Sequence, residues 1–467
     1  MRLSDSQLQT IRRLLENEAR GYFTAGQPVV AGRAPGRLDV MGGVADYSGS
    51  VVLEWPIADA AVVVLQRRSD RRLRVWSIGP EAGNLGRDRF EMSLDDFADG
   101  GGPRSEEAIR AFFAERDARW AGYVLGAFYI LQVEEGIRID RGADLLLRSS
   151  VPLGAGVASS AALEVAAMSA VERSLGLSLD DMRFARLCQL VEHRVVGAPC
   201  GIMDQVTCTL GRAGDLLALR CQPHDLLGYE TVPDDCRLVG IDSGVKHSVG
   251  ASRYVRARVG AFMGLKIISR HVEASRASAG GYLGNFTPEE FRSAYYDLIP
   301  SRIRGADFLA AYGEIDDSAT RVDPDAVYSP RGCAEHAIYE NERVKRFAEY
   351  LARARAGDRS ALVGAGEQMY GSHWSYSYRV ALGSAETNLL VQIARRYSKR
   401  GVRGAKITGG GSGGTVALLL DERAAGGGGD PVLEIAREYE MRSGNRARVV
   451  AGTSPGARQW GVREIDA

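Results

Sequence analysis

The stretch PLGAGVASSAALE, residues 152–164, joins a short apolar segment to a long alanine-rich one. Gly154 and Gly156 allow backbone N–H groups to turn inward toward an anion. Residues 160–175 are good helix formers, and Gly176 can end that helix. Because the N-terminal end of a helix carries partial positive charge, the loop is suited to hold phosphate. A plain strand-to-helix turn is the alternative, since glycine-rich motifs often occur without a ligand.

The composition is that of a globular protein with no charge bias. The 467 residues are 45% apolar and 25% charged, and the length favours two domains. The 59 basic and 59 acidic side chains balance, which argues against a nucleic-acid partner. No apolar run reaches membrane-spanning length and no signal-peptide pattern is present, so no membrane partner is expected. The six cysteines lack metal-type or disulfide-type spacing, which favours reduced thiols in the cytoplasm.

The first half of the chain mixes strand and helix patterns. Residues 58–78, ADAAVVVLQRRSDRRLRVWSI, predict a β-hairpin that turns at Ser69 and Asp70. Residues 143–148 predict a short strand leading into the glycine-rich loop, and residues 180–197 predict a second helix.

Near LVGIDSG (238–244) the sequence pattern changes and another strand begins, which places a domain boundary close to residues 225–240. We therefore predict an N-terminal domain at 1–235 and a C-terminal domain at 236–467. Residues 278–330 are rich in Gly, Pro, Tyr and Asp and predict an insertion of turns and short helices. Residues 335–357 predict a long amphipathic helix.

A second glycine-rich stretch, APGRLDVMGGVADYSGS (34–50), carries Arg37, Asp39 and Asp46. It holds too many glycines for a regular helix. Arginine binds phosphate well, and carboxylates can hold sugar hydroxyls. The stretch therefore predicts a binding site, with a turn closed by a structural ion pair as the alternative.

A third stretch, VEHRVVGAPCGIMDQ (191–205), places Glu192 late on a predicted helix. The Gly-Ala-Pro-Cys-Gly break then puts Asp204 at the start of a new segment. A carboxylate placed by such a break suits a functional site, and a surface N-cap aspartate is the alternative.

A fourth stretch, KITGGGSGG (406–414), reads as a strand end followed by a glycine loop before the strand of 415–421. Five glycines in six positions allow close approach of the backbone to a ligand, and a flexible turn is the alternative. No single stretch is decisive, but the order and co-occurrence of all four are.

Together these stretches resemble the motifs of the GHMP small-molecule kinases, and within them the galactokinase group. APGRLDVMGGVADYSG resembles the N-terminal signature, PLGAGVASSAALE the phosphate loop, PCGIMDQ the catalytic-aspartate motif and KITGGGSGG the C-terminal glycine motif. DSGVKHSVGASRY (242–254) also matches the group. The resemblance implies an α+β fold with a cleft between two α/β domains. It also implies a kinase that uses ATP and Mg²⁺ on a small-molecule sugar, as a monomer or homodimer.

The resemblance carries roles to individual positions. Asp204 matches the residue that orients or deprotonates the attacking hydroxyl, and Arg37 matches the residue facing both that aspartate and the γ-phosphate. Ser160 and Glu192 match the magnesium ligands. The positions matching the ATP and phosphate cradle are Gly154, Ala155, Gly156, Val157, Ala158, Ser159, Ser160, Gly410 and Gly411. The positions expected at the sugar are Asp46, Gly43, Val44, Gly201, Asp204 and Tyr254. Trp120 and Tyr123 match a family stretch but are predicted to pack in the core.

Gly43 and Val44 depart from the galactokinase pattern. Galactokinases usually carry Glu-His there, a pair that contacts the C6 hydroxymethyl end of galactose. Loss of that pair removes hydrogen bonds to the 6-hydroxyl and so costs discrimination in favour of galactose. L-Arabinopyranose has the hydroxyl stereochemistry of galactopyranose without that group. GRLDVMGGVADYSGS and MYGSHWSYS (369–377) also resemble their L-arabinokinase versions in plants. We therefore expect L-arabinose 1-phosphate as the product.

Three alternatives stay open. The first is a galactokinase in which neighbouring residues still hold the 6-hydroxyl. The second is a D-galacturonate 1-kinase, which needs a cation near the C6 carboxylate, with His373 or Lys246 as candidates. The third is a sensor that binds sugar and ATP without turnover, and the presence of both Arg37 and Asp204 argues against it.

Overall fold

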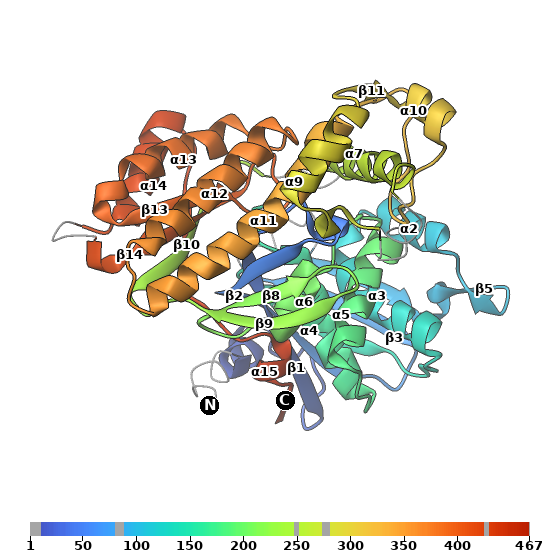
Figure 1. The fold of residues 1–467 in the computed structure, drawn as a ribbon. Coiled ribbons are helices and arrows are strands. Elements are labelled where there is room, and N and C mark those ends of the chain that lie inside the picture. The colour runs from blue at the N-terminus through green and yellow to red at the C-terminus, as the bar shows by residue number, and fades with distance from the viewer. Residues whose placement is uncertain (1–10, 80–87, 247–251, 273–280, 425–428, 467) are drawn as a thin grey trace.

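The computed structural model describes residues 11–79, 88–246, 252–272, 281–424 and 429–466. Helices and strands are mixed along the chain and build two main sheets covered by helices, as expected for the α+β class (Figure 1). Within these described residues the larger sheet has eight strands, with the path β16-β1-β2-β7-β3-β4, and β8 joins β2 to β9. Its strands are β1 (Pro28–Met41), β2 (Val51–Arg67), β3 (Arg72–Ile78), β4 (Arg89–Ser93), β7 (Ala143–Ser149), β8 (Asp215–Arg220), β9 (Asp225–Thr231) and β16 (Arg463–Asp466).

The second sheet has four antiparallel strands in the order β13-β14-β10-β15. They are β10 (Cys236–Asp242), β13 (Val402–Ile407), β14 (Thr415–Asp421) and β15 (Arg448–Val450). The predicted glycine loop lies between β13 and β14, so the strand, loop and strand of 406–421 are confirmed.

The predicted helices form at their expected places. The stretch 160–175 lies in α4 up to Ser174, and residues 181–196 of the stretch 180–197 lie in α5 and the π-helical turn η5 that continues it. The amphipathic stretch 335–357 lies largely in α11. The longer helices are α2 (Glu106–Glu115), α3 (Arg119–Glu135), α4 (Ser159–Ser174), α5 (Asp181–Leu190) with η5 (Val191–Val196), α6 (Met203–Leu210), α7 (Ser252–Ser269), α10 (Gly305–Tyr312), α11 (Pro330–Arg355), α12 (Ala361–Tyr378), α13 (Ala385–Arg396) and α14 (Pro431–Ser443), followed by the short α15 (Ala457–Trp460).

The predicted hairpin at 58–78 is wrong. The chain does turn between β2 and β3, but β7 lies between these two strands, antiparallel to β2 and parallel to β3. Asp144 of β7 accepts hydrogen bonds from Arg68 at 3.0 Å and from Arg74 at 2.5 Å. The carboxylate on the central strand thus neutralises two arginines that flank the turn, and this pairing favours the inserted strand over a direct hairpin.

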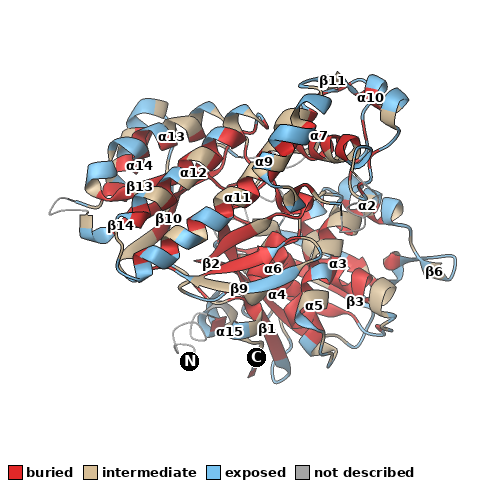
Figure 2. Ribbon diagram, viewed as in Figure 1, coloured by how far each residue is buried: buried red, intermediate tan, exposed pale blue. Residues whose placement is uncertain are grey.

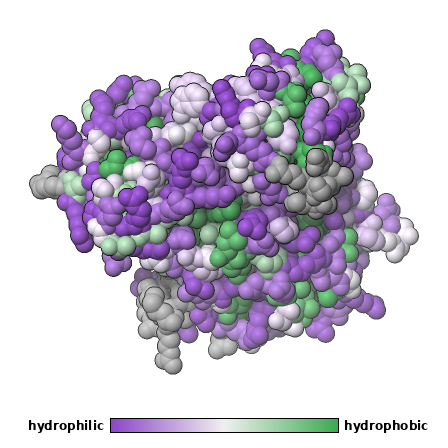
Figure 3. All heavy atoms as spheres, in the orientation of Figure 1, coloured by the Kyte–Doolittle hydropathy of each residue, from purple (hydrophilic) through white to green (hydrophobic). Residues whose placement is uncertain are grey.

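The hydrophobic core joins the two sheets. Its largest cluster contains Val63 of β2, Val165 of α4, Phe347 of α11 and Leu419 of β14. Figure 2 shows the buried residues running through the large sheet, while the outer faces of the helices are exposed. Most of the face in Figure 3 is hydrophilic, with hydrophobic side chains gathered at its centre over β8 and β9.

The second sheet begins with β10 at Cys236, close to the predicted domain boundary. The last strand, β16, nevertheless returns to the first sheet and pairs with β1. The division at 235/236 stays a prediction. Residues 281–330 contain short elements, namely η6 (Leu283–Asn285), α9 (Pro288–Glu290), η7 (Phe291–Tyr295), η8 (Tyr296–Leu298), β11 (Ile303–Arg304), α10 and β12 (Val327–Tyr328), whereas residues 278–280 lie outside the described residues. Among the helices of the described ranges, none is both long and apolar enough to cross a membrane.

Candidate active site

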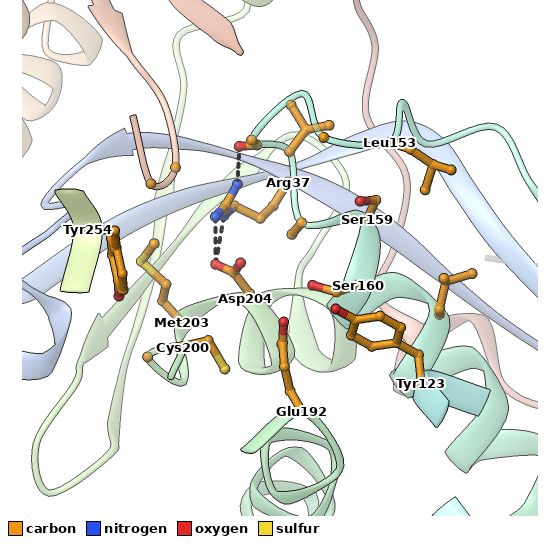
Figure 4. Close-up of a pocket in the computed structure, with 18 of the residues that line it drawn as sticks. Arg37, Tyr123, Leu153, Ser159, Ser160, Glu192, Cys200, Met203, Asp204 and Tyr254 are labelled. Atoms are coloured by element: carbon orange, nitrogen blue, oxygen red, sulfur yellow. Dashed lines mark hydrogen bonds and ion pairs between the residues drawn. The ribbon is translucent and has the colours of Figure 1, made fainter. Parts of the chain in front are cut away.

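A cavity of about 270 Å³ opens where β1, the loop before α4 and the start of α6 meet (Figure 4). All four motif stretches contribute to its wall. The predicted site residues that line it are Arg37, Val44, Asp46, Gly154, Gly156, Val157, Ala158, Ser159, Ser160, Glu192, Gly201, Asp204, Tyr254 and Gly410. Of the matching stretch 242–254, Tyr254 reaches the cavity, and residues 247–251 lie outside the described residues.

Arg37 and Asp204 form a hydrogen-bonded ion pair at this wall. Arg37 Nε and Nη2 both donate to Asp204 Oδ1, at 2.9 and 2.7 Å, and Nη1 donates to Gly156 O at 2.8 Å. Arg37 lies on the buried strand β1, whereas Asp204 lies in the first turn of α6. The Arg37 side chain is 3% exposed and that of Asp204 20%. The carboxylate is therefore the partner that opens to the cavity.

A second carboxylate supports Arg37 from behind. Glu54 Oε2 lies 3.1 Å from Arg37 Nε, and both side chains are buried. Burial alone would lower the pKa of Arg37, but Asp204 and Glu54 together raise it above its usual value. Burial raises the pKa of Glu54 well above its usual value, and Asp39 adds to the rise. Arg37 is consequently a permanent cation between the glycine-rich loop and α6.

The loop between β7 and α4 is shaped by left-handed backbone conformations. Gly154 and Gly156 have φ angles of +71°, and Ala158, the N-cap residue of α4, has φ of +59°. Alanine has no side-chain acceptor to cap the helix, so the first amides of α4 have no side-chain partner from this residue. Amides in this arrangement at a helix N-terminus are suited to an anion.

The two glycine-rich loops lie against each other. Thr415 donates through N and Oγ1 to Ala155 O, at 3.0 and 2.8 Å. A Cβ on Gly409 would come within 2.4 Å of Gly156 O, and one on Gly414 within 2.7 Å of Ala155 O. Glycine is therefore required at both positions for the two backbones to meet, and this contact joins the second sheet to the cavity.

An acidic cluster borders the cavity beside α4. Gln205 Nε2 donates to Glu192 Oε2 at 2.9 Å and to Glu164 Oε2 at 3.0 Å. Burial raises the pKa of Glu192 to about 7, and Asp204 adds to the rise while Ser160 and Gln205 oppose it. Burial and then Glu192 raise the pKa of Glu164 well above its usual value. The buried surroundings thus favour the protonated form of both carboxyls.

The opposite end of the cavity is formed by Asp46, Gly201 and Tyr254. Asp46, in the short helix η2 (Asp46–Ser48), is 2% exposed. A Cβ on Gly201 would lie 1.4 Å from Asp46 Oδ2, so only glycine lets this carboxylate approach the α6 entry loop. Burial raises the pKa of Asp46 to about 6, although Arg258 opposes the rise. The group thus provides a buried acceptor at the cavity wall.

Three predicted positions do not line the cavity. Ala155 turns its carbonyl to Thr415 in the loop contact described above. Gly411 packs on Leu382, where a Cβ would lie 2.6 Å from the carbonyl oxygen. Gly43 lies behind Val44, against Asp39 and Tyr376. Their glycine or alanine identity reflects close packing with neighbouring segments.

Residues outside the predicted set complete the cavity. Trp120 and Tyr123 of α3, predicted as core residues, line it together with Leu153 and Leu163 and make one end apolar. Trp120 also belongs to the core, as predicted. The remaining additions are Pro199, Cys200, Met203 and Gly409.

Glu164 and Gln205 also lie outside the predicted set. Both were within the quoted motifs. Glu164 follows Ser160 by four residues, which puts both on one face of α4, and Gln205 is adjacent to Asp204. Helical spacing from Ser160 was therefore the signal for Glu164.

The comparisons with known proteins agree with this architecture. The model of the GHMP kinase N-terminal domain matches residues 122–212. A galactokinase from Chloroflexus aurantiacus is 31% identical over 82% of each chain. The chain therefore belongs to the GHMP kinase family, and within it to the group of the galactokinases.

The similarity also extends to one relative with another name. An L-arabinokinase from Arabidopsis thaliana is 39% identical over 99% of this chain. The chain spans about half, 49%, of the length of that relative. The crystal structure of Lactococcus lactis galactokinase complexed with galactose matches with a TM-score of 0.73 at 23% identity, covering 99% of this chain and 100% of that one, which shows a shared fold.

Proposed function

We propose that the chain is an ATP-dependent sugar 1-kinase that converts L-arabinose to L-arabinose 1-phosphate. The observation that carries the proposal is the Arg37–Asp204 ion pair, which lines the same cavity as the glycine-rich loop and is bonded to that loop through Gly156 O. A carboxylate beside a phosphate-binding loop is the arrangement needed to direct a hydroxyl at a terminal phosphoryl group.

In this proposal Asp204 and Arg37 have separate roles in the reaction. Oδ2 of Asp204, which accepts no hydrogen bond from Arg37, accepts the proton of the anomeric hydroxyl or orients it, since Oδ1 is occupied by Arg37. Arg37 offsets the negative charge that grows on the transferred phosphoryl group. Because phosphoryl transfer depends mainly on positioning and charge stabilisation, Asp204 does not need to be a strong base.

The cavity chemistry fits a magnesium ion. Ser160 and Glu192 both line it and offer a hydroxyl and a carboxylate oxygen, which are donors that Mg²⁺ prefers. In our proposal these two residues would hold the ion. When bound, it neutralises phosphate charge. The amides of 154–160 bind phosphate, and the apolar end around Trp120 and Leu163 accommodates a flat base.

The sugar lies between Asp204 and the end formed by Asp46 and Tyr254. Val44 contributes methyl groups to this end, and methyl groups cannot hydrogen-bond a sugar hydroxyl. A pentopyranose has no exocyclic hydroxymethyl group, so it loses no hydrogen bond against such a wall. The 39% identity to an L-arabinokinase supports this substrate.

D-Galactose is the second candidate, because galactokinases are among the relatives of the chain. D-Galacturonate is less well supported. Among the described residues that line the cavity, the cation is Arg37, which is engaged by Asp204 and Glu54. His373 is buried and accepts from Ile407 N, and Lys246 is not part of the wall. A sensor would bind sugar and ATP without turnover, so any turnover of the two would exclude this alternative.

The test is a substrate panel at fixed ATP and Mg²⁺, with ADP release as the readout. L-Arabinose is expected to give the highest kcat/KM among L-arabinose, D-galactose, D-fucose and D-galacturonate. D-Fucose, which has a methyl group at C6, tests the space in front of Val44. A wide margin for galactose would replace the substrate, and binding of sugar and ATP without ADP release would favour the sensor.

The localisation, the partners, the oligomeric state and the domain division complete the proposal. All six cysteines are free, which suits the reducing cytoplasm. We propose no nucleic-acid or membrane partner, and a state of monomer or homodimer. The two-domain division at 235/236 is kept as a working description of the fold.

A further inference from the structure

Gly43 is enclosed by two side chains. A Cβ at this position would lie 1.9 Å from Asp39 Oδ2 and 2.0 Å from Tyr376 Oη. The φ angle of Gly43 is not among the positive ones, so the backbone does not require glycine here. The requirement is one of space. Tyr376 of α12 occupies the volume that a larger residue at position 43 would fill.

Tyr376 is firmly anchored in that place. It is fully buried, and its hydroxyl lies 3.0 Å from Gly409 O and 3.2 Å from Asp39 Oδ2, to one of which it donates at a time. Lys406 Nζ donates to Asp39 Oδ2 at 2.9 Å and holds the carboxylate from the other side. Burial and then Asp39 raise the pKa of Tyr376, so its phenol stays protonated.

His336 of α11 holds the same peptide by its carbonyl. Its Nε2 lies 3.1 Å from Gly43 O, and its Nδ1 lies 2.8 Å from Ser375 Oγ. A carbonyl oxygen only accepts, so Nε2 carries the proton and Nδ1 accepts from the serine. Burial lowers the pKa of His336 to about 4, which keeps this neutral form. The imidazole also packs edge-to-face on Tyr376, with ring centroids 5.3 Å apart.

The next residue, Val44, is held in a strained conformation. Its φ angle is +56°, in the left-handed region that β-branched residues rarely adopt. Such strain persists only where the surroundings enforce it. Val44 is 2% exposed and lines the cavity beside Asp46. The Gly43 peptide, which is enclosed and hydrogen-bonded, comes directly before Val44 in the chain and constrains its backbone.

We propose that Tyr376 and His336 are positioning residues for sugar selection, which hold the Gly43 peptide so that Val44 stands as the apolar wall of the sugar end. This inference rests on the proposed sugar kinase function. It explains why Gly43 and Tyr376 belong together, although 333 positions separate them. Neither Tyr376 nor His336 lines the cavity, so both act through Val44.

The first test is Tyr376→Phe, which keeps the ring and removes the hydroxyl. We expect the ratio of kcat/KM for L-arabinose to that for D-galactose to fall about five-fold, through the sugar KM, with the KM for ATP unchanged. Tyr370→Phe is the matched control, because Tyr370 is a buried tyrosine of the same helix whose hydroxyl has no partner among the described residues. An unchanged ratio in Tyr376→Phe, or an equal fall in the control, would overturn the proposal.

The second test measures coupling between positions 43 and 376. Gly43→Ala should weaken sugar binding strongly in the parent chain and less in the Tyr376→Phe background, where one of the two obstructing oxygens is absent. Equal losses in both backgrounds would contradict the proposal. Calorimetric binding of L-arabinose and D-galactose needs no turnover, so it tests the positioning role even if the parent chain releases no ADP. An absence of ADP release by the parent chain would instead refute the kinase function. If Gly43→Ala fails to fold, the Tyr376→Phe ratio still decides.

Discussion

Arg37 contacts Asp204 through two nitrogens that converge on one carboxylate oxygen, Oδ1, and leave Oδ2 toward the cavity. A side-by-side pair of bonds would have used both oxygens. The converging geometry ties the orientation of Asp204 to Arg37, while the same guanidinium reaches the glycine-rich loop through Gly156 O. One buried side chain thus aligns both halves of the proposed reaction.

Asp204→Asn is expected to lower kcat by about two to four orders of magnitude, because the amide cannot accept the proton of the attacking hydroxyl or carry its charge. Binding of sugar and ATP should persist, as calorimetry can establish. Asp307→Asn is a matched control, since Asp307 is an exposed aspartate in the first turn of α10. Turnover within a few-fold of the parent would assign the proton acceptor elsewhere.

Arg37→Met is expected to lower the free energy of unfolding by about 3–5 kcal/mol, because Asp204 and Glu54 both lose the guanidinium that they face. Chemical denaturation measures the loss. The double variant with Glu54→Gln should recover part of it. Arg72→Met, which breaks an exposed pair with Glu91, should cost less than about 1 kcal/mol. A similar small cost at both sites would show that Glu54 does not depend on Arg37.

Glu192→Gln tests the pH dependence of the acidic cluster. Glu192 is protonated below its pKa of about 7 and ionised above it, so activity at limiting Mg²⁺ should rise as pH passes that value. The variant should need more Mg²⁺ and lose this step. A pH profile that keeps the step in Glu192→Gln would assign it to another group.

The same carboxyl affects stability with a definite sign. The pKa of Glu192 in the folded chain lies above the usual value of 4.5. The stabilising contribution of this carboxyl is therefore complete below pH 4.5 and is lost as the pH rises through about 7. Glu192→Gln should therefore raise the melting temperature more at pH 8 than at pH 5, measured without Mg²⁺. A larger gain at pH 5 would reverse the assigned direction.

Val44→Asn should improve galactose use relative to L-arabinose. Asparagine tolerates the left-handed backbone at φ +56° and offers hydrogen bonds where valine offers methyl groups. Initial rates with both sugars measure the ratio. Val44→Leu is the apolar control and should not favour galactose. If both variants shift the ratio equally, the cause is cavity shape rather than hydrogen bonding.

Much of the fold followed from local pattern. The helix of α4 and the strands around 406–414 could be predicted because their signals, helix formers and glycine breaks, lie within a dozen residues. The insertion of β7 between β2 and β3 could not, since the turn at 69–70 is compatible with either pairing. The inserted strand brings Asp144, which is distant in sequence, to Arg68 and Arg74 only in the folded sheet.

The candidate site divides in the same way. Arg37, Ser160, Glu192 and Asp204 could be named from the motifs, and the structure brings them to one cavity. Gly43 was expected at the sugar, yet its glycine identity comes from Tyr376 and Asp39, which pack against it from other elements. Likewise the raised pKa of Glu192 comes from burial and from Asp204 beyond the helix break.

The amino-acid order alone determined which segments bend, which continue as helices and which chemical groups stand at the bends, because those properties depend on neighbours along the chain. Tertiary structure alone decided which groups share a buried environment. Side-chain volume, charge and desolvation act between residues that are close in space, so the strain at Val44, the pairing of Glu164 with Glu192 and the support of Arg37 by Glu54 exist only after the distant segments have packed together.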